Sequence, residues 1–258
     1  MRVELLGLPV DILTRRETLG RALAAMRGRT RCQHVALNVA KLVQARRDPE
    51  LDRDVRESDI VGIDGAGIAL ALRLLGEGRV ERVAGIDLFQ DLVGLCAAEG
   101  LRPYLLGARP EVVGETAQVL ARRHPGLVLA GWHDGYFRPD EEEAVCRAIA
   151  ESRADCLFIA LPTPAKERFM ARHRDRLGVP FVMGVGGSFD VIAGRVRRAP
   201  RLVQAAGLEW FYRLAQEPRR LAARYLRTNA AFAVLLAGAL LRRLAHGRPV
   251  LRRADHRG

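Results

Sequence analysis

The chain has 258 residues, of which 49% are hydrophobic and 28% are charged, and its formal net charge is +12. A chain of this length and apolar content can bury a sizeable core, as one large α/β domain or as two small lobes. Its four cysteines lie far apart and form no C-x-x-C pair, which argues against a zinc site or a disulfide framework. The positive net charge suggests a polyanionic partner: nucleic acid, anionic lipid or a phosphorylated substrate. The cationic charge is almost all arginine, which suits planar phosphate recognition, and a high genomic GC content would give the same arginine bias.

The N-terminal segment is predicted to contain a helix, a strand and a second helix. Its first residues lack the basic region, apolar run and small-residue cleavage site of a signal peptide, so we expect a cytoplasmic protein. Thr14 is placed to cap a helix over 15–27, with Glu17 at the third helical position. A strand over 34–38 comes next and then a helix, which places Asn38 at a strand end.

The stretch from Asp59 to Gly67 is the centre of the predicted fold. Its β-branched residues are bounded by glycines, which is typical of a buried strand of an α/β sheet, and a helix over 68–75 follows. Asp64 therefore lies at the carboxyl end of a strand, the edge at which open α/β sheets bind ligands. An acid there can act as a base, hold a ribose, bind a metal or simply cap the helix.

The next 120 residues alternate between strands and helices. Strands are predicted over 102–107, 127–131, 155–161 and 180–187, and helices over 89–98, 110–123 and from 165 onward. Asp140 is placed to cap another helix, with Glu143 completing a capping box. This alternation predicts parallel strands with right-handed crossovers, in a Rossmann-like α/β core.

The pattern changes near Gly194, after which strand signals disappear and arginines interleave with bulky apolar residues at helical spacing. We expect an α/β core over 1–194 and a basic, helical, membrane-proximal appendage over 195–258. Pro218 is placed to start one of its helices.

An apolar run over 229–241 is too short for a membrane span, which needs about 20 such residues. It can pack on the domain or lie in a membrane interface. The basic stretch from Arg242 onward is expected to be frayed.

Three polar patterns remain open from the residues alone. Gly65-x-Gly67 lacks the third glycine of a dinucleotide fingerprint, so a nicotinamide or flavin site is not supported. The glycine turn at 185–190 can bring backbone N–H groups to a ligand or be a plain tight turn. The arginines over 195–201 can hold a diphosphate or form a solvated basic surface. Together these features fit a nucleotide-diphosphate donor and a phosphorylated acceptor.

A series of short motifs over residues 30–227 resembles the WecG/TagA/CpsF family of bacterial glycosyltransferases, glycosyltransferase family 26. The motifs occur in this order: Asn38, Asp64-Gly65, Arg82-x-x-Gly85-x-Asp87-Leu88, His124-Pro125-Gly126, Asp134-Gly135-Tyr136-Phe137, Pro164-x-x-Glu167, Gly184-Val185-Gly186-Gly187-x-Phe189-Asp190, Arg198-Ala199-Pro200, Gly207-Leu208-Glu209-Trp210-x-x-Arg213-Leu214 and Glu217-Pro218-x-Arg220. Each motif is weak alone, but the ordered set is specific.

The resemblance implies an inverting transfer of a sugar from a UDP-sugar to a saccharide on polyprenyl diphosphate, in surface polysaccharide biosynthesis. The sugar would be an N-acetylhexosamine such as N-acetylmannosamine, or a related hexose or uronic acid. No metal or other cofactor is implied. The enzyme would be cytoplasmic, associated peripherally with the inner face of the cell membrane and not with nucleic acid, and a homo-oligomer is possible.

The resemblance also implies roles for individual residues. Asp64 would be the general base. The appendage would supply Arg213, Arg220 and Arg224 to the diphosphate. Other substrate-binding positions carried over from the motifs are Asn38, Gly65, Arg82, Asp87, Lys166, Glu167, Gly186, Gly187 and Arg198.

Two positions depart from the family pattern. Ala36 stands where the family usually has threonine, and Lys166 stands where it usually has glutamine. A lysine there can hold an acidic group or a phosphate, so the donor or acceptor can differ from those of better-known members. Two alternatives remain: a basic, non-catalytic α/β protein that binds nucleic acid or anionic membrane, and a catalytically silent membrane scaffold.

Overall fold

The computed structural model describes residues 1–246 and 251–253, apart from the side chains of 205, 220, 246, 252 and 253. Its centre is a six-stranded sheet in the order β4-β3-β8-β7-β5-β6, in which every paired neighbour is parallel. The strands are β3 (Cys32–Leu37), β4 (Ile60–Ile63), β5 (Pro103–Gly107), β6 (Gly131–His133), β7 (Cys156–Ala160) and β8 (Phe181–Gly184). The predicted Rossmann-like α/β class is confirmed.

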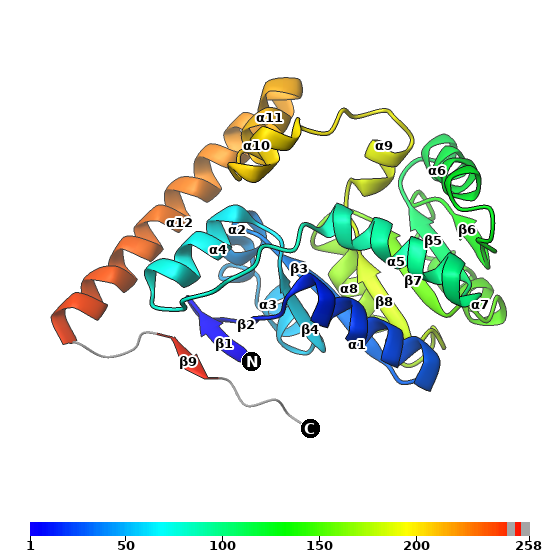
Figure 1. Cartoon of the computed structure of the whole chain (residues 1–258), viewed down its shortest axis with the longest axis horizontal. Coiled ribbons are helices and arrows are strands. Elements are labelled where there is room, and N and C mark those ends of the chain that lie inside the picture. The colour runs from blue at the N-terminus through cyan, green and yellow to red at the C-terminus, as the bar shows by residue number, and fades with distance from the viewer. Residues whose placement is uncertain (247–250, 254–258) are drawn as a thin grey trace.

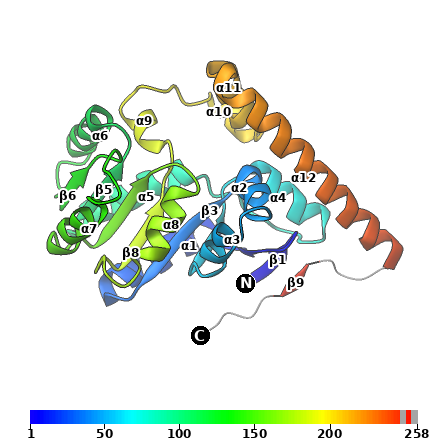
Figure 2. The same ribbon diagram turned by 180° about the vertical axis from the view of Figure 1, so that it is seen from behind.

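Helices cover both faces of this sheet, as Figures 1 and 2 show from opposite sides. One face carries α1 (Arg15–Gly28), α5 (Gly85–Glu99), α6 (Pro110–Arg123) and α9 (Ser188–Ile192). The other carries α2 (Val39–Ala45), α3 (Pro49–Arg56), α4 (Ala66–Leu74), α7 (Glu142–Glu151) and α8 (Ala165–Arg172). Side chains alternate between the two layers along each strand, so in β7 Phe158 packs in the first layer and Leu157 and Ile159 in the second.

Several predicted boundaries hold, and the misses have local causes. Thr14 and Glu17 form the expected capping box of α1. Strand β6 begins at Gly131, not at Leu127, because a turn from His124 to Leu127 delays the chain's return to β5.

The helix predicted after Asp140 begins at Glu142 without a side-chain cap. Asp140 is instead paired with Arg138 at 2.8 Å, so the predicted capping box with Glu143 is wrong. Helix α5 begins at Gly85, four residues earlier than the helix predicted from Phe89.

An N-terminal hairpin was not predicted. Strands β1 (Arg2–Leu5) and β2 (Leu8–Asp11) pair antiparallel, and β9 (Arg252–Arg253) adds to β1. Strand β2 is buried at all four positions and so lacks the alternation that marks a strand. Residues 252–253 thus return to the N-terminal hairpin, and residues 242–246 are helical, which corrects the expectation of a frayed end for both stretches. Residues 247–250 and 254–258 lie outside the described part.

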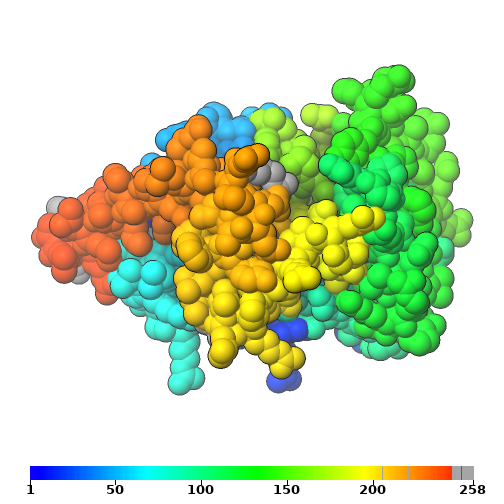
Figure 3. Space-filling view, turned by 90° about the horizontal axis from the view of Figure 1, so that it is seen from above, coloured from blue at the N-terminus to red at the C-terminus, as the bar shows by residue number. Residues whose placement is uncertain are grey.

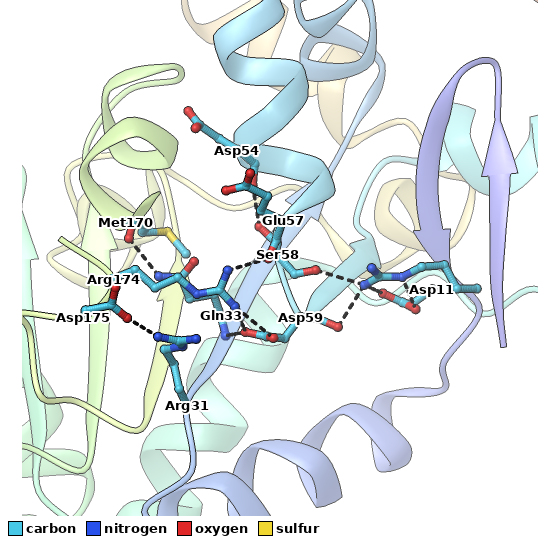
Figure 4. A network of polar contacts seen from close by, with 11 residues as sticks. Asp11, Arg31, Gln33, Asp54, Glu57, Ser58, Asp59, Met170, Arg174 and Asp175 are labelled. Atoms are coloured by element: carbon cyan, nitrogen blue, oxygen red, sulfur yellow. Dashed lines mark hydrogen bonds and ion pairs between the residues drawn. The ribbon is translucent and has the colours of Figure 1, made fainter. Parts of the chain in front are cut away.

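The hairpin is fastened to the amino end of β4 by a buried ion pair. Arg2 lies 2.7 Å from Asp11 and also donates to the carbonyl oxygens of Ser58 and Asp59. Asp11 accepts a further hydrogen bond from the backbone N–H of Val61 at 2.8 Å. Figure 4 shows this network continuing from Asp59 to Gln33 and Arg174, at the opposite end of the strands from Asp64.

The C-terminal region forms α10 (Arg201–Ala205), α11 (Glu209–Gln216) and α12 (Pro218–His246). Pro218 starts α12 as predicted, and α12 packs on α2, with Phe232 among its buried residues (Figure 1). The division of the chain at 194/195 stays a prediction.

The apolar run over 229–241 is part of a longer helix. Within α12, the segment Leu221–Ala245 has 25 residues and is long and apolar enough to cross a membrane by length and composition. This corrects the prediction that the run is too short, because the flanking residues continue the same helix. A helix packed on a soluble core can meet the same test, so this property alone gives only weak support for a membrane span.

Candidate active site

The strand order brings the predicted site residues to one edge. Strands β4, β3, β8 and β7 are consecutive neighbours, so their carboxyl ends lie side by side. Asp64 follows β4, Asn38 follows β3, Gly186 follows β8, and Lys166 lies in the first turn of α8 after β7. We call these four strand ends the carboxyl edge. Residues as distant in the chain as Asn38 and Gly186 converge there because parallel strands with crossover helices all end on the same side.

Asp64 is held by the first residue of α5 and by the loop that precedes this helix. Its Oδ1 atom accepts a hydrogen bond from the backbone N–H of Gly85 at 2.8 Å, and its carbonyl oxygen accepts one from Nε of Arg82 at 2.7 Å. The N-cap of α4 is Gly65, with no side-chain cap. Asp64 is therefore not the cap of α4, and its partly exposed carboxylate is oriented by a backbone donor at the carboxyl edge.

Asn38 and Gly65 shape the adjoining strand exits. Asn38 caps α2 by accepting a hydrogen bond from the backbone N–H of Lys41 at 3.0 Å. A Cβ atom at Gly65 would lie 3.0 Å from Cα of Asn38, so a side chain there would push the β3 and β4 exits apart. Both residues are at the carboxyl edge as predicted. There Asn38 caps a helix, and Gly65 allows the exits of β3 and β4 to lie close together.

A buried cluster joins the exits of β3 and β7 across β8. Glu167 Oε1 lies 2.8 Å from Nζ of Lys41 and 2.9 Å from Nζ of Lys166, while Lys166 also donates to Oγ1 of Thr163 at 2.5 Å. Lys41 donates to the carbonyl oxygen of Ala36 as well. We call Lys41, Thr163, Lys166 and Glu167 the lysine–glutamate cluster.

The charges of this cluster are almost entirely removed from solvent: Lys41, Lys166 and Glu167 are 3%, 7% and 1% exposed. Burial, together with the charge of Lys41, lowers the pKa of Lys166 to about 8, although Glu167 and Asp64 act in the opposite direction. Burial opposes ionisation of Glu167, but the two lysines outweigh it and lower its pKa to about 2. Glu167 is therefore ionised at neutral pH, and its Oε2 atom is buried without a hydrogen-bond partner.

The free energy of unfolding should rise between about pH 8 and pH 10.5 because of Lys166. Its pKa is about 8 in the folded chain against an ordinary 10.5, so in this interval the unfolded chain binds a proton that the folded chain does not. Denaturant unfolding of wild type and Lys166→Met at both ends of the interval measures this. The wild type should gain stability relative to the variant as pH rises; a constant difference would contradict the prediction.

A second group of charges joins the start of α5 and the loop before it to α11 and to the segment between α9 and α10. Arg198 forms a bidentate contact with Asp87, with both N–O distances at 2.6 Å, and Arg82 is hydrogen-bonded to Glu209. Nε of Arg198 lies 3.7 Å from Oε1 of Glu209. We call Arg82, Asp87, Arg198 and Glu209 the arginine junction. Arg82, Asp87 and Arg198 were predicted to bind substrate, and here each is engaged with another member of the junction.

The glycine turn after β8 is tight and closed by its own backbone. Gly186 has a φ of +53°, and the N–H of Ser188 donates back to the carbonyl of Val185 at 3.2 Å. Arg213 of α11 reaches this turn, since a Cβ atom at Gly187 would lie 2.8 Å from Nη2 of Arg213. Of the predicted appendage arginines, Arg213 is thus at the carboxyl edge.

The other two predicted appendage arginines are on α12. Arg224 is exposed, and its guanidinium carbon lies 5.3 Å from the ring centroid of Tyr225. The side chain of Arg220 lies outside the described part of the structure.

Lys41, Thr163 and Glu209 were not predicted as site residues. Lys41 gives the clearest signal in retrospect, since it lies three residues after Asn38, in the first turn of the helix that follows a strand end. All four cysteines are free and buried. Within residues 1–246 and 251–253, no three His, Cys, Asp or Glu side chains gather as a metal-ligand group.

The parallel sheet and its carboxyl edge define a Rossmann-like α/β protein, a class whose ligands bind at this edge. Within that class, residues 3–246 match the model of the WecG/TagA/CpsF glycosyl transferase family, and the chain belongs to that family. Members of this family are glycosyltransferases of polysaccharide or cell-wall biosynthesis, and they are typically cytoplasmic enzymes. The family implies a nucleotide-sugar donor and a lipid-linked acceptor.

Proposed function

We propose that the protein is an inverting glycosyltransferase that moves a sugar from a UDP-sugar to a saccharide on polyprenyl diphosphate, with Asp64 as the general base. The observation that carries the proposal is the placement of Asp64. Its carboxylate lies at the carboxyl edge, is oriented by the N–H of Gly85 and does not cap a helix. The family match makes the chain a glycosyl transferase, and transfer of a sugar to a hydroxyl group calls for a base of this kind.

The chemistry requires a base and a means of stabilising a leaving diphosphate. A sugar hydroxyl is a poor nucleophile, and a carboxylate can take its proton as the new glycosidic bond forms. The departing UDP gains negative charge, which positioned arginines and backbone N–H groups can stabilise. Arg82, Arg198 and Arg213 lie around the carboxyl edge and supply such donors once substrate is bound.

The transferred sugar is proposed to be an N-acetylhexosamine such as N-acetylmannosamine, or a related hexose or uronic acid. Lys166 and Glu167 support a site for a charged or hydroxyl-rich group. The ammonium group of Lys166 lies close enough to Asp64 for that carboxylate to raise the pKa of the lysine. Glu167 retains an acceptor oxygen, Oε2, that has no hydrogen-bond partner. Asn38, Gly65, Gly186 and Gly187 line the adjoining exits of the carboxyl edge.

The acceptor is proposed to reach the protein from the cytoplasmic face of the membrane, in capsule, exopolysaccharide or cell-wall synthesis. Helices α10 and α11 expose Leu202, Trp210 and Phe211, and arginines surround them in the sequence. Aromatic and aliphatic side chains of this kind enter a membrane interface, and each basic residue near an anionic surface adds about 1 kcal/mol of attraction. Arg224 of α12 is proposed to help hold the lipid diphosphate, together with Arg220.

UDP release tests this proposal. A panel of UDP-N-acetylhexosamines, UDP-hexoses and UDP-uronic acids is combined with polyprenyl-diphosphate-linked saccharides in anionic vesicles. Release that depends on the acceptor, followed by identification of the lengthened lipid-linked product, is expected for at least one pair. Binding of generic DNA with steep salt dependence, and no release with any pair, would favour the non-catalytic alternative.

A further inference from the structure

Helices α10 and α11 lie directly over the carboxyl edge. Gly207, between the two helices, approaches Ala66 so closely that a Cβ at Gly207 would lie 2.8 Å from Cβ of Ala66, two residues after Asp64. Arg213 of α11 rests on the turn at Gly187. Figure 3, which views the molecule from the side of α9–α11, shows the yellow-to-orange segment across the middle of this face. The appendage therefore lies over strand exits at which the proposed function places the substrate.

Glu209 is the anion that this covering segment places among the arginines. Its carboxylate is hydrogen-bonded to Arg82, and the pair is only 22% and 18% exposed. The other carboxylate oxygen is 3.7 Å from Nε of Arg198, beyond hydrogen-bonding distance. Nε of Arg198 is buried and has no hydrogen-bond partner. Glu209 thus satisfies Arg82 and leaves a buried donor of Arg198 unsatisfied.

A diphosphate matches this pair of arginines better than a carboxylate does. The donors that face Glu209 are Nη2 of Arg82 and Nε of Arg198, since Asp87 holds both terminal nitrogens of Arg198. Arginine donors form strong, charge-assisted hydrogen bonds with phosphate oxygens, and an unsatisfied buried donor costs free energy that a suitable acceptor recovers. A diphosphate carries more acceptor oxygens over a greater length than one carboxylate, so it can reach Nε of Arg198 while still accepting from Arg82. Arg82 also holds the carbonyl of Asp64, so an anion bound here lies next to the proposed base.

We propose that the carboxylate of Glu209 occupies the position of a substrate diphosphate between Arg82 and Arg198, and that the incoming diphosphate displaces it and releases α11 from the carboxyl edge. The inference rests on the proposed function in one respect, that the ligand carries a diphosphate. The diphosphate can belong to the nucleotide donor or to the lipid acceptor. Glu209 is in this account an internal competitor of substrate.

Trp210, next to Glu209 on α11, provides the readout. It is half-exposed and packs edge-on against Tyr225, with ring centroids 6.0 Å apart, so movement of α11 changes its surroundings. The experiment uses the full chain carrying Trp132→Phe, which leaves Trp210 as the one tryptophan. Fluorescence is followed during titration with inorganic pyrophosphate, UDP and farnesyl diphosphate; the last two distinguish the donor from the acceptor as the source.

Glu209→Gln is expected to lower the Kd for pyrophosphate by about tenfold, the effect of losing one charge-assisted competitor. Glu209→Asp, which keeps the charge but withdraws it by one methylene, should lower the Kd to a smaller extent. The matched control is Glu115→Gln, which removes the same charge from another arginine partner, Arg195, in an exposed pair elsewhere. Its Kd should equal that of wild type. Thermal unfolding of each variant establishes that it is folded.

Unchanged or weaker pyrophosphate binding by both Glu209 variants, or no binding by any chain, would overturn the inference. Failure of the proposed function is separate, because it is measured by acceptor-dependent UDP release. If release occurs while the Glu209 variants bind as wild type does, only the inference is lost. If the variants bind more tightly but no pair supports release, the competitor role remains and the proposed reaction is lost.

Discussion

Asp64→Asn is expected to reduce sugar transfer by about 10²–10⁴-fold, the usual contribution of general base catalysis, with little effect on stability. Asparagine has nearly the same shape, and its side-chain oxygen can still accept the hydrogen bond from the N–H of Gly85 that now reaches Oδ1 of Asp64. It cannot take a proton from the acceptor hydroxyl. Acceptor-dependent UDP release by the wild type and the variant gives the ratio of rates.

The control for this variant is Asp175→Asn. It removes the same charge from a side chain that is 82% exposed and pairs with Arg31, just before the amino end of β3. We expect wild-type transfer from it. Thermal unfolding should show both variants folded. Full turnover by a folded Asp64→Asn chain would remove Asp64 from its proposed role.

Glu167→Ala is expected to lower the free energy of unfolding by about 3–5 kcal/mol at neutral pH, the usual cost of leaving a buried charge without its partner. Glu167 is the anion shared by Lys41 and Lys166, and all three are buried. Its removal leaves two buried ammonium groups facing each other. Urea unfolding of both chains measures the difference as a shift of the midpoint.

The pH dependence of this difference provides an additional test. The pKa of Glu167 is lowered from 4.5 to about 2 in the folded chain, so its stabilisation is complete above about pH 4.5 and is lost as the pH falls through about 2. Glu50→Ala removes a carboxylate that is 53% exposed and lies 2.8 Å from Arg168. We expect it to cost less than about 1 kcal/mol. Equal losses from the two variants would show that the buried cluster is no more stabilising than a surface pair.

Much of the fold could be predicted because its signals are local. The β-branched runs, the glycine exits and capping residues such as Thr14 depend on neighbours a few positions away, and they place most strands and helices correctly. Asn38 and Asp64 could be assigned to strand ends on the same grounds. The short hairpin strand Leu8–Asp11 could not be predicted, because it is buried on both faces and has no period.

The site was predictable only as separate segments. Lys41 and Glu167 meet because β3 and β7 both flank β8. No local sequence pattern predicts this order of strands in the sheet. Arg82 and Glu209 are 127 positions apart, and their contact depends on where α11 rests. The arginines were therefore predicted as free cations for substrate, whereas the folded chain pairs Arg82 and Arg198 with carboxylates.

The sequence by itself determined the α/β class, the position of Asp64 at a strand end and the family, because each depends on residue types within short windows. Only the tertiary structure decided that Glu167 is shared by two lysines and that Glu209 lies among the arginines at the covered carboxyl edge. The physical reason is that a charge interacts with whatever packing places within a few ångströms of it. That neighbourhood is set by strand order and helix docking, which no short window of sequence contains.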